Sequence, residues 1–555
     1  MSLLDYIAII IFTAGVLVAG LSFSKAGKSM KSFFAAGGNV PWWIVGLSLF
    51  MGFFSAGTFV VWGSIAYTHG LVAVTIQGCM CIAGFLVAVF IASRWKRTRV
   101  FTAAEYITNR LGNGVQKAYT YLFLLISLFT MGSFLYPVAK IVEVSTGLPL
   151  QTAILLLGGV SILYVTVGGL WAVVVTDVLQ FVILMAAVLI VVPLSFEKIG
   201  GMDNFLQHAP EDFFRVFNGE YTLFFIAAFC IYNFVFLGGQ WSYVQRYTSV
   251  RTEKDARKVG MLFASLYLIC PVLWMLPPMI YRIYNGDLTG LADEGAYLLM
   301  CKAVLPKGIL GLMIGGMVFA TASSLNGSLN ISAGVFTNDI FKRLFPHSTD
   351  KSLMKAARFS TIGFGLLAIV VALLIPLMGG IVNVVISIAA LTGAPLYLPV
   401  VWTLFSRRQN KYTVLFTTLF SLTVNALFKF VTPLFGLSLD RATEMMTGVL
   451  VPIAVLSLIE LYFIIRKKED PQAAVCERMI QERIDRQQQE EENSPKAITD
   501  DNRASLKVIG LGVCLSGALI LLLGALSEGF SRAVVCGVAA ALVLLGAWIY
   551  VKSKK

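Results

Sequence analysis

Long apolar segments separated by short polar stretches recur along the whole chain. Fifteen are predicted, near residues 4–24, 41–67, 70–93, 118–142, 150–167, 170–195, 221–239, 259–283, 308–336, 357–378, 381–405, 412–431, 446–465, 506–526 and 529–551. A helix needs about 20 apolar residues to cross the hydrocarbon core of a bilayer. Because lipid offers no hydrogen bonds, the backbone of each segment must pair internally, as it does in a helix. The pattern therefore predicts an all-α polytopic membrane protein with about 15 transmembrane spans.

The composition supports the same class. Of the 555 residues, 57% are hydrophobic and 13% are charged, whereas soluble domains carry about 25% charged residues. This composition excludes a soluble enzyme, and the loops leave no room for a separate catalytic domain. We therefore expect a protein that is not an enzyme.

The formal net charge of +13 is sorted between alternate loops. Basic residues cluster near 25–31, 94–99, 246–258, 342–358, 407–411, 466–468 and 552–555. By the positive-inside rule these stretches are cytoplasmic, so the N-terminus lies outside and the C-terminus inside the plasma (inner) membrane. The first segment has Asp5 and no basic residue before Lys25, which indicates a retained span rather than a signal peptide. The basic excess indicates topology and not nucleic-acid binding.

Two segments carry polar features that a lipid-facing helix would not need. In 41–67, Gly52 and Gly57 bracket a short stretch where the helix can unwind and leave inward-facing carbonyls for a small hard cation. The alternative is that these glycines allow close helix packing. In 319–341 the polar side chains include Ser323, Ser324, Asn326, Ser328, Asn330 and Ser332, which are too many for a lipid-facing helix. Neutral oxygens of this kind suit Na⁺ and not Zn²⁺.

An acid and two amides within other predicted spans also bear on function. Asp177 is about two turns into the sixth segment, and an intramembrane acid is by default an ion ligand or a proton carrier. The alternative for Asp177 is a structural pairing with a hydroxyl or an arginine. Gln77 and Asn233 are single amides, for which a packing hydrogen bond is the simplest interpretation.

Several stretches, in this order, resemble the sodium:solute symporter family, which includes sodium–sugar, sodium–proline, pantothenate and sialic acid transporters. They are FFAAGGNVPWW with SAGTF, FTAAEYITNRLG (101–112), GGLWAVVVTDVLQ, QRYTSVRTEKDARK (245–258) and ASSLNGSLNISAGVFTNDIF. The likeness runs over about 25–465, and the ordered combination is far more specific than any single motif.

The resemblance implies the leucine-transporter-type fold, with ten core helices in two inverted five-helix repeats. The core would span 41–406, with repeats at about 41–195 and 221–406. An extra span and a cytoplasmic loop (1–40) would precede it. Two spans (407–465), a charged cytoplasmic excursion (466–505), and two last spans with a basic tail (506–555) would follow. Opposite charges at helical spacing predict a solvated surface helix in the excursion, and a regulatory or partner role stays open.

The resemblance also implies site residues. The family's sodium site falls on the carbonyls of Met51, Phe54 and Ala320 and the hydroxyls of Ser323 and Ser324. A second sodium site would use Asp177 and Asn326, although Gly327 lacks the side-chain oxygen expected beside Asn326. The number of sodium ions bound, one or two, therefore stays open.

For the solute, the corresponding positions are Thr58, Gln77, Asn233, Phe236 and Tyr267. Asn233 matches a sugar-contacting asparagine and Phe236 matches an aromatic gate. Thr58, Gln77 and Tyr267 stand where sodium–galactose members have a glutamine, an acid and a lysine. The loss of charge implies a neutral or weakly polar organic solute, or one with a single anionic group, such as a sugar or a sialic acid.

The function implied is a sodium-coupled secondary active symporter working by alternating access, with Na⁺, an organic solute and the lipid bilayer as partners and no nucleic acid. A proton-coupled carrier using Asp177 is the main alternative. A membrane-embedded subunit of a redox complex is more remote, because such subunits need chains of Lys, Glu and His through the membrane. The oligomeric state stays open.

Overall fold

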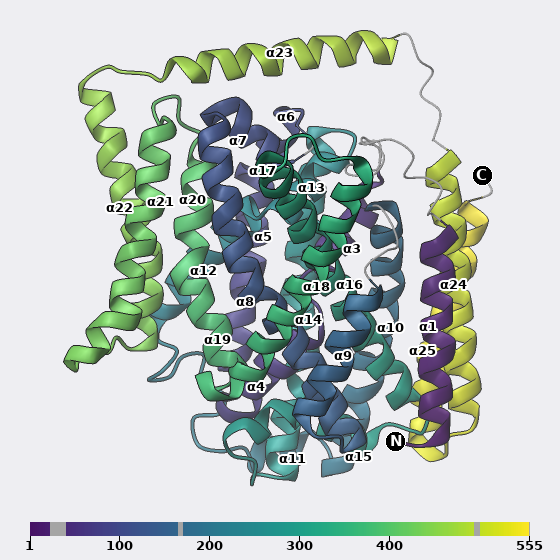
Figure 1. The fold of residues 1–555 in the computed structure, drawn as a ribbon. Helices are drawn as coiled ribbons and strands as arrows, with labels where there is room; N and C mark the ends of the chain where they lie inside the picture. The colour runs from purple at the N-terminus through teal and green to yellow at the C-terminus, as the bar shows by residue number, and fades with distance from the viewer. Residues whose placement is uncertain (23–39, 101, 165–169, 493–499, 554–555) are drawn as a thin grey trace.

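The computed structural model describes residues 1–22, 40–100, 102–164, 170–492 and 500–553. Within these ranges the regular elements are helices, and one isolated parallel bridge joins Val40 to Val250. Most of the long helices stand side by side in a bundle, while α23 lies across one end of it (Figure 1). The predicted all-α fold class is confirmed.

The first half of the chain forms α1 (Leu3–Ser22), α3 (Trp42–Met51), η2 (Thr58–Trp62), α4 (Gly63–His69), α5 (Val72–Phe90), α6 (Ala92–Arg97), α7 (Ala103–Leu111), α8 (Asn113–Thr146), α9 (Leu150–Tyr164), α10 (Leu170–Ile199), α11 (Met202–Gln207), α12 (Leu223–Gly239) and α13 (Trp241–Ser249). The part of the chain from 253 to 402 forms α14 (Glu253–Tyr284), η3 (Gly290–Gly295), α15 (Ala296–Val304), α16 (Ile309–Val335), η4 (Phe336–Phe341), α17 (Lys342–Leu344), α18 (Asp350–Leu374), η5 (Ile375–Met378), α19 (Gly380–Ile388), η6 (Ala389–Gly393) and α20 (Ala394–Trp402). The last part forms α21 (Lys411–Ala426), η7 (Leu427–Val431), η8 (Thr432–Phe435), α22 (Arg441–Ile465), α23 (Pro471–Glu492), α24 (Asp500–Ala525) and α25 (Gly529–Lys552).

Many of these helices are long and apolar enough to cross a membrane. Among the described residues there are 10 such helices, and the bent pair α12 and α13 makes up to 11. Four more predicted segments correspond to shorter apolar helices, Leu3–Val16, Trp42–Met51, Leu150–Gly159 and Ile309–Ala322. The chain is therefore a multi-pass membrane protein, and the total of fifteen spans stays a prediction.

Several helices of the bundle are interrupted. The predicted segment 41–67 is divided into α3, an irregular stretch, the π-helix η2, and α4. The segment near 221–249 bends by 58° between α12 and α13, and the run from α19 to α20 contains the π-helix η6. π-helical turns inside α-helices occur frequently at functional sites. The interruptions therefore mark where a site is to be sought.

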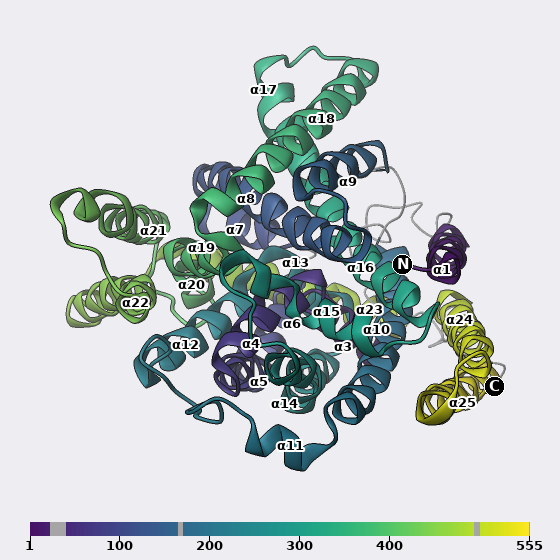
Figure 2. The same cartoon turned by 90° about the horizontal axis from the view of Figure 1, so that it is seen from below.

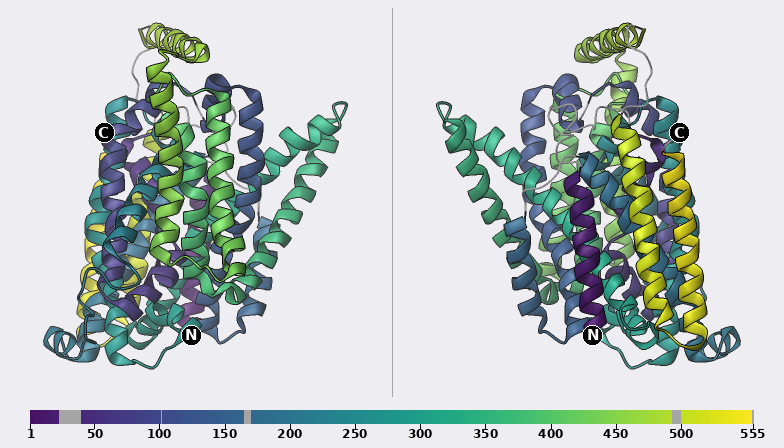
Figure 3. Two further views of the ribbon diagram at one scale, coloured as in Figure 1. Left: turned by 90° about the vertical axis from the view of Figure 1, so that its left-hand side faces the viewer. Right: turned by 90° about the vertical axis from the view of Figure 1, so that its right-hand side faces the viewer.

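Two groups of helices flank this interrupted core. Figure 2 shows α1, α24 and α25 together on one side and α21 and α22 on the opposite side. In the hairpin of α17 and α18 the helices lean away from the body (Figure 3). Large apolar side chains on the flanking helices are exposed, for example Leu544 at 72% and Leu522 at 68%. In a bilayer these side chains would contact lipid, as expected for peripheral spans.

Small residues allow α24 and α25 to pack closely. A Cβ atom at Gly517 would lie 2.9 Å from the backbone nitrogen of Val543 and 3.1 Å from the carbonyl oxygen of Ala539. Glycine is required here because another backbone occupies the space. By contrast, Gly537 on α25 has no atom within 4 Å of a built Cβ.

We predict that Gly517→Ala destabilises the hairpin of α24 and α25, by about 1–3 kcal/mol, because the added methyl group meets backbone that cannot rotate away. The measurement is the midpoint of thermal unfolding of the purified protein in detergent. Gly537→Ala is the matched control and should leave the midpoint nearly unchanged. Equal midpoints for the two variants would contradict the packing described.

Candidate functional site

The break in the second predicted segment lies between Met51 and Thr58. The Thr58 hydroxyl donates to the carbonyl oxygen of Phe53 (2.7 Å) and accepts from the amide of Ser55 (3.1 Å). A Cβ at Gly52 would lie 3.0 Å from Cε1 of Tyr243 in α13. The prediction that this stretch unwinds is confirmed. Gly52 also permits the close packing that was the alternative explanation.

The break removes the helical partners of two carbonyls. In an α-helix the amides of Ser55 and Thr58 would donate to the carbonyls of Met51 and Phe54, four residues earlier. Here the Ser55 amide donates to Thr58 Oγ1, and the Thr58 amide donates to the Ser55 carbonyl at 2.9 Å. Met51 and Phe54 are both buried. Buried carbonyls that have lost their helical donors are suitable ligands for a hard cation.

The break is joined directly to α16. The amide of Ala56 donates to Thr321 Oγ1 (3.0 Å), and the Thr321 hydroxyl donates to the Met317 carbonyl of its own helix (2.9 Å). Ala320, next to Thr321, is buried. The structure therefore brings the stretch 51–58 and the predicted ligand Ala320 to adjoining parts of two helices.

Of the predicted hydroxyl ligands on α16, Ser324 is half-buried, and its Oγ lies 3.4 Å from the Ala320 carbonyl oxygen. The side chains of Ser323 and Asn326 lie outside the described residues. Thr321 was not singled out from the sequence, although its hydroxyl lies within the same polar run. A group of three or more His, Cys, Asp or Glu side chains that could hold a metal ion is absent from the described residues.

Asp177 in α10 is buried and paired. Ser48 Oγ in α3 donates to Asp177 Oδ2 at 2.6 Å, and Arg246 Nη2 in α13 donates to Ser48 Oγ at 3.4 Å. One hydroxyl thus links a carboxylate and a guanidinium from three helices. This arrangement matches the structural pairing that was the alternative for Asp177.

Of the predicted solute residues, Thr58, Phe236 and Tyr267 have contacts at the break. The ring of Phe53 is 6.1 Å from Phe236 and 6.4 Å from Tyr267, measured between ring centroids. Thr58 is held within the break, as described above. Asn233 Nδ2 donates to the Phe229 carbonyl of its own helix (2.8 Å), and Gln77 in α5 is buried.

The aromatic surroundings include residues that the sequence did not single out. Tyr243 stacks on Phe53 at 4.7 Å, and Trp274 stacks on Phe54 at 4.6 Å. Trp274 is fully buried, and its Nε1 has no hydrogen-bond partner among the described residues. A buried donor without a partner, next to the break, is available to a bound molecule. Tyr243 and Trp274 could not be singled out from the sequence, because an aromatic residue in an apolar helix gives no indication of its neighbours.

Polar residues on α4 hold the opposite end of the broken helix. Ser64 Oγ donates to Asp293 (2.8 Å), Tyr67 OH donates to the Asn285 carbonyl (2.8 Å), and His69 Nε2 lies 3.2 Å from Glu220. These three partners come from η3 and from two loops. The outer turns of α4 are therefore held by segments that are separate in sequence.

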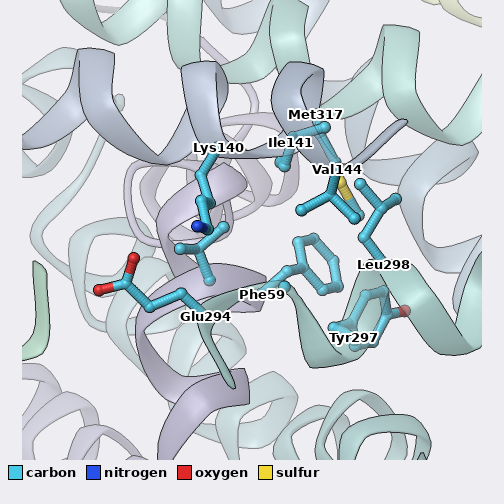
Figure 4. A pocket seen from close by; sticks show the side chains of 10 residues that line it. Phe59, Lys140, Ile141, Val144, Glu294, Tyr297, Leu298 and Met317 are labelled. Atoms are coloured by element: carbon cyan, nitrogen blue, oxygen red, sulfur yellow. The ribbon is translucent and has the colours of Figure 1, made fainter. Parts of the chain in front are cut away.

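Glu294 attaches η3 to two further helices. Its carboxylate accepts from Tyr136 OH in α8 (2.7 Å) and from the Ile381 amide in α19 (3.0 Å). Glu294 and Lys140 line a small cavity beside Phe59 (Figure 4). The cavity volume is about 10 Å³, which is enough for about one water molecule.

The carboxylates at this end of the broken helix differ in the direction in which their pKa is shifted. Burial raises the pKa of Asp293 and of Glu294 above the ordinary values. The hydrogen bond from His69, aided by the charge of Arg441, lowers the pKa of Glu220. Glu220 is thus favoured as the anion, whereas burial favours the neutral form of the two acids in η3.

We predict that Thr58→Val destabilises the protein by about 1–3 kcal/mol, because it leaves the buried Ser55 amide without its acceptor. Thermal unfolding in detergent measures the effect. Thr75→Val is the matched control, since among the described residues the Thr75 hydroxyl bonds only to the Leu71 carbonyl, at the start of its own helix (3.3 Å). If both variants unfold at the wild-type temperature, the hydroxyl does not hold the break.

Comparison with known proteins identifies the family. The model of the sodium:solute symporter family matches residues 33–420. The chain is 28% identical over 418 residues to the sodium/glucose cotransporter of Vibrio parahaemolyticus, which covers 69% of this chain and 76% of that protein. It is 29% identical over 418 residues to sodium/myo-inositol cotransporter 2 of Bos taurus, of which it spans 60%. These relatives are transporters and not enzymes, as predicted.

The fold is similar to that of a Na⁺-coupled sialic acid symporter in a substrate-bound outward-open state. The TM-score is 0.68 at 22% sequence identity, over 83% of this chain and 98% of that chain. At this identity the likeness concerns the fold. The family match covers well over half of the sequence and confirms the resemblance found in the motifs: the chain belongs to the sodium:solute symporter family.

Proposed function

We propose that the chain is a sodium-coupled secondary active symporter that imports a small organic solute across the plasma membrane by alternating access. The observation that carries this proposal is the break between Met51 and Thr58, where two buried carbonyls have lost their helical donors beside α16. Discontinuous helices at mid-membrane are where transporters of this type bind their coupling ions. Family membership supports sodium as the coupling ion.

In this proposal one Na⁺ is bound by the carbonyls of Met51, Phe54 and Ala320 and by the hydroxyls of Ser323 and Ser324. All five ligands are neutral oxygens, so the ion brings the charge. Bridging α3 and α16 by an ion would stabilise one arrangement of the two helices relative to the other. The membrane potential adds about 2.3 kcal/mol per charge per 100 mV to the drive for accumulation.

The solute would bind next to the break, among Thr58, Gln77, Asn233, Phe236 and Tyr267. Aromatic faces with a few polar groups are typical of small-molecule sites. We add Trp274 as a donor, because its buried Nε1 has no partner among the described residues. The names of the relatives include glucose, myo-inositol and sialic acid, which favours a sugar or a similar polyol.

The fold organisation follows from the same family. We propose ten core helices over 41–406, in two inverted repeats over about 41–195 and 221–406, with the other spans flanking them. The basic clusters 94–99 and 246–258 lie at the α23 end of the bundle, around α6 and α13 (Figure 1). By the positive-inside rule this end is cytoplasmic, and the N-terminus is outside.

A proton-coupled carrier using Asp177 is the second candidate. Its support is that Asp177 is a buried carboxylate within a predicted span, while the link through Ser48 to Arg246 is what a structural role requires. The same acid with Asn326 would serve a second sodium ion. The two roles can be distinguished by whether uptake of the solute depends on the proton or on the sodium concentration.

We predict that Ser324→Ala and Ser323→Ala each raise the sodium concentration for half-maximal uptake about tenfold, because each removes one ligand worth about 1–3 kcal/mol. The assay is uptake into proteoliposomes at varied sodium. The solute is first chosen by a thermal-shift screen of sugars, polyols, sialic acids, amino acids and carboxylates with and without sodium. Ser328→Ala is the matched control, since its hydroxyl donates to the Ser324 carbonyl of the same helix (3.0 Å).

Unchanged uptake at low sodium in both variants would contradict the sodium assignment. Uptake that follows pH, ignores sodium and disappears in Asp177→Asn would establish the second candidate instead.

A further inference from the structure

The charged helix α23 docks against the end of the bundle. Ala473 and Cys476 are buried, and Met479, Ile480 and Ile484 are half-buried. These positions recur every three or four residues and so form one face of the helix. The sequence predicted a solvated surface helix here. The structure confirms the helix and shows that one face of it is packed against the protein.

One set of contacts joins α23 to both ends of α7. Arg483 Nη1 lies 2.8 Å from Glu105 Oε1, in the first turn of α7. Gln472 Nε2 donates to the Asn109 carbonyl in the last turn (3.0 Å). Arg110, which is only 3% exposed, pairs with Asp470 just before α23. Removing either partner of the Arg110–Asp470 pair would leave an uncompensated charge. This contact between α7 and the start of α23 is therefore costly to break.

A second set of contacts joins α23 to the loop between α20 and α21. Arg407 Nε lies 2.8 Å from Glu477 Oε1, and the Asp470 amide donates to the Arg407 carbonyl (3.0 Å). Arg110 also reaches this loop, through the Gln409 carbonyl (2.9 Å). Both sets of contacts lie between Asp470 and Arg483, so this part of the chain is fastened over α7 and the loop after α20.

The contacts continue from α7 to the bend between α12 and α13. The ring of Tyr106 in α7 packs edge-on against Trp95, with 5.1 Å between centroids. Trp95 Nε1 donates to the carbonyl of Gly238 (2.7 Å), one residue from the end of α12. Beyond the bend, α13 carries Arg246, which reaches Ser48 of the broken helix. An unbroken series of contacts thus links α23 to the two interrupted helices.

We propose that α23 is a cytoplasmic strap, in which Arg483 and Glu105 are positioning residues that hold α7 and, through it, α13 in the arrangement seen here. The expected effect on sodium binding rests on the proposed transport function, whereas the holding of α7 and α13 by α23 does not. Loosening the strap lets α13 move away from α6 and α7, which opens this end of the bundle. Sodium bound between α3 and α16 from the other side is then held less tightly.

The test is a charge-reversal series in the full-length protein: Arg483→Glu, Glu105→Arg, and the double variant that restores the pair with its charges exchanged. Hydrogen exchange of residues 103–111 and 241–249 should become faster in each single variant and return toward wild type in the double variant. The sodium concentration for half-maximal uptake should rise about threefold in the single variants and recover in the double one. Arg478→Glu reverses an exposed charge on the same helix and is the matched control.

Wild-type exchange of 103–111 in Arg483→Glu, or equal effects of Arg478→Glu, would overturn the proposal. If Arg483→Glu does not fold, Arg483→Gln removes the pair without repulsion and is read in the same way. Faster exchange that is rescued by the double variant, together with uptake that ignores sodium in all variants, would support the strap and count against the sodium symporter instead.

Discussion

The middle of a bilayer offers no water, so any backbone group that leaves a helical ladder there must find another partner. This constraint governs the broken helix at 51–58. The Thr58 hydroxyl takes the Ser55 amide from inside the break, and Thr321 takes the Ala56 amide from α16. Both replacements satisfy amides. The Met51 carbonyl loses the Ser55 amide in this way, and the Phe54 carbonyl loses the Thr58 amide, which donates to the Ser55 carbonyl instead. The break is thus stable as a protein structure and at the same time suited to a cation.

Side-chain hydrogen bonds also hold this helix on either side of the break. On one side Ser48 links Asp177 to Arg246, and on the other the hydroxyls of α4 bond to η3 and neighbouring loops. A rocking motion of the broken helix would have to exchange these contacts. Because hydroxyl bonds are worth about 1 kcal/mol each, such an exchange is compatible with reversible movement. Aromatic rings around Phe53 fill the space between the two ends.

Local patterns were sufficient for much of this description. Hydropathy predicted an all-α membrane protein, and the glycines at 52 and 57 allowed an unwound stretch between them, with close helix packing as the alternative. Ser323, Asn326 and Asn330, at helical spacing, predicted one polar face in 319–341 that lines either helix contacts or a wet pathway. For Asp177, residue type allowed an ion ligand, a proton carrier or a structural pair, and the structure brings the hydroxyl and the arginine that a pair requires. Trp274 and Tyr243 could not be found in this way, because an aromatic residue in an apolar helix carries no sign of its neighbours.

The sequence by itself determined the class of protein, the helical segments, the family and the position of the break. These depend on local composition and on motifs, which are present before the chain folds. Only the tertiary structure decided the partners: Thr321 for Ala56, which is 265 residues away, Arg246 for Ser48, and α7 for α23. A helix in lipid satisfies its own backbone, so its sequence shows that it will form but not which helix it adjoins. That choice depends on side chains of several segments packing at once.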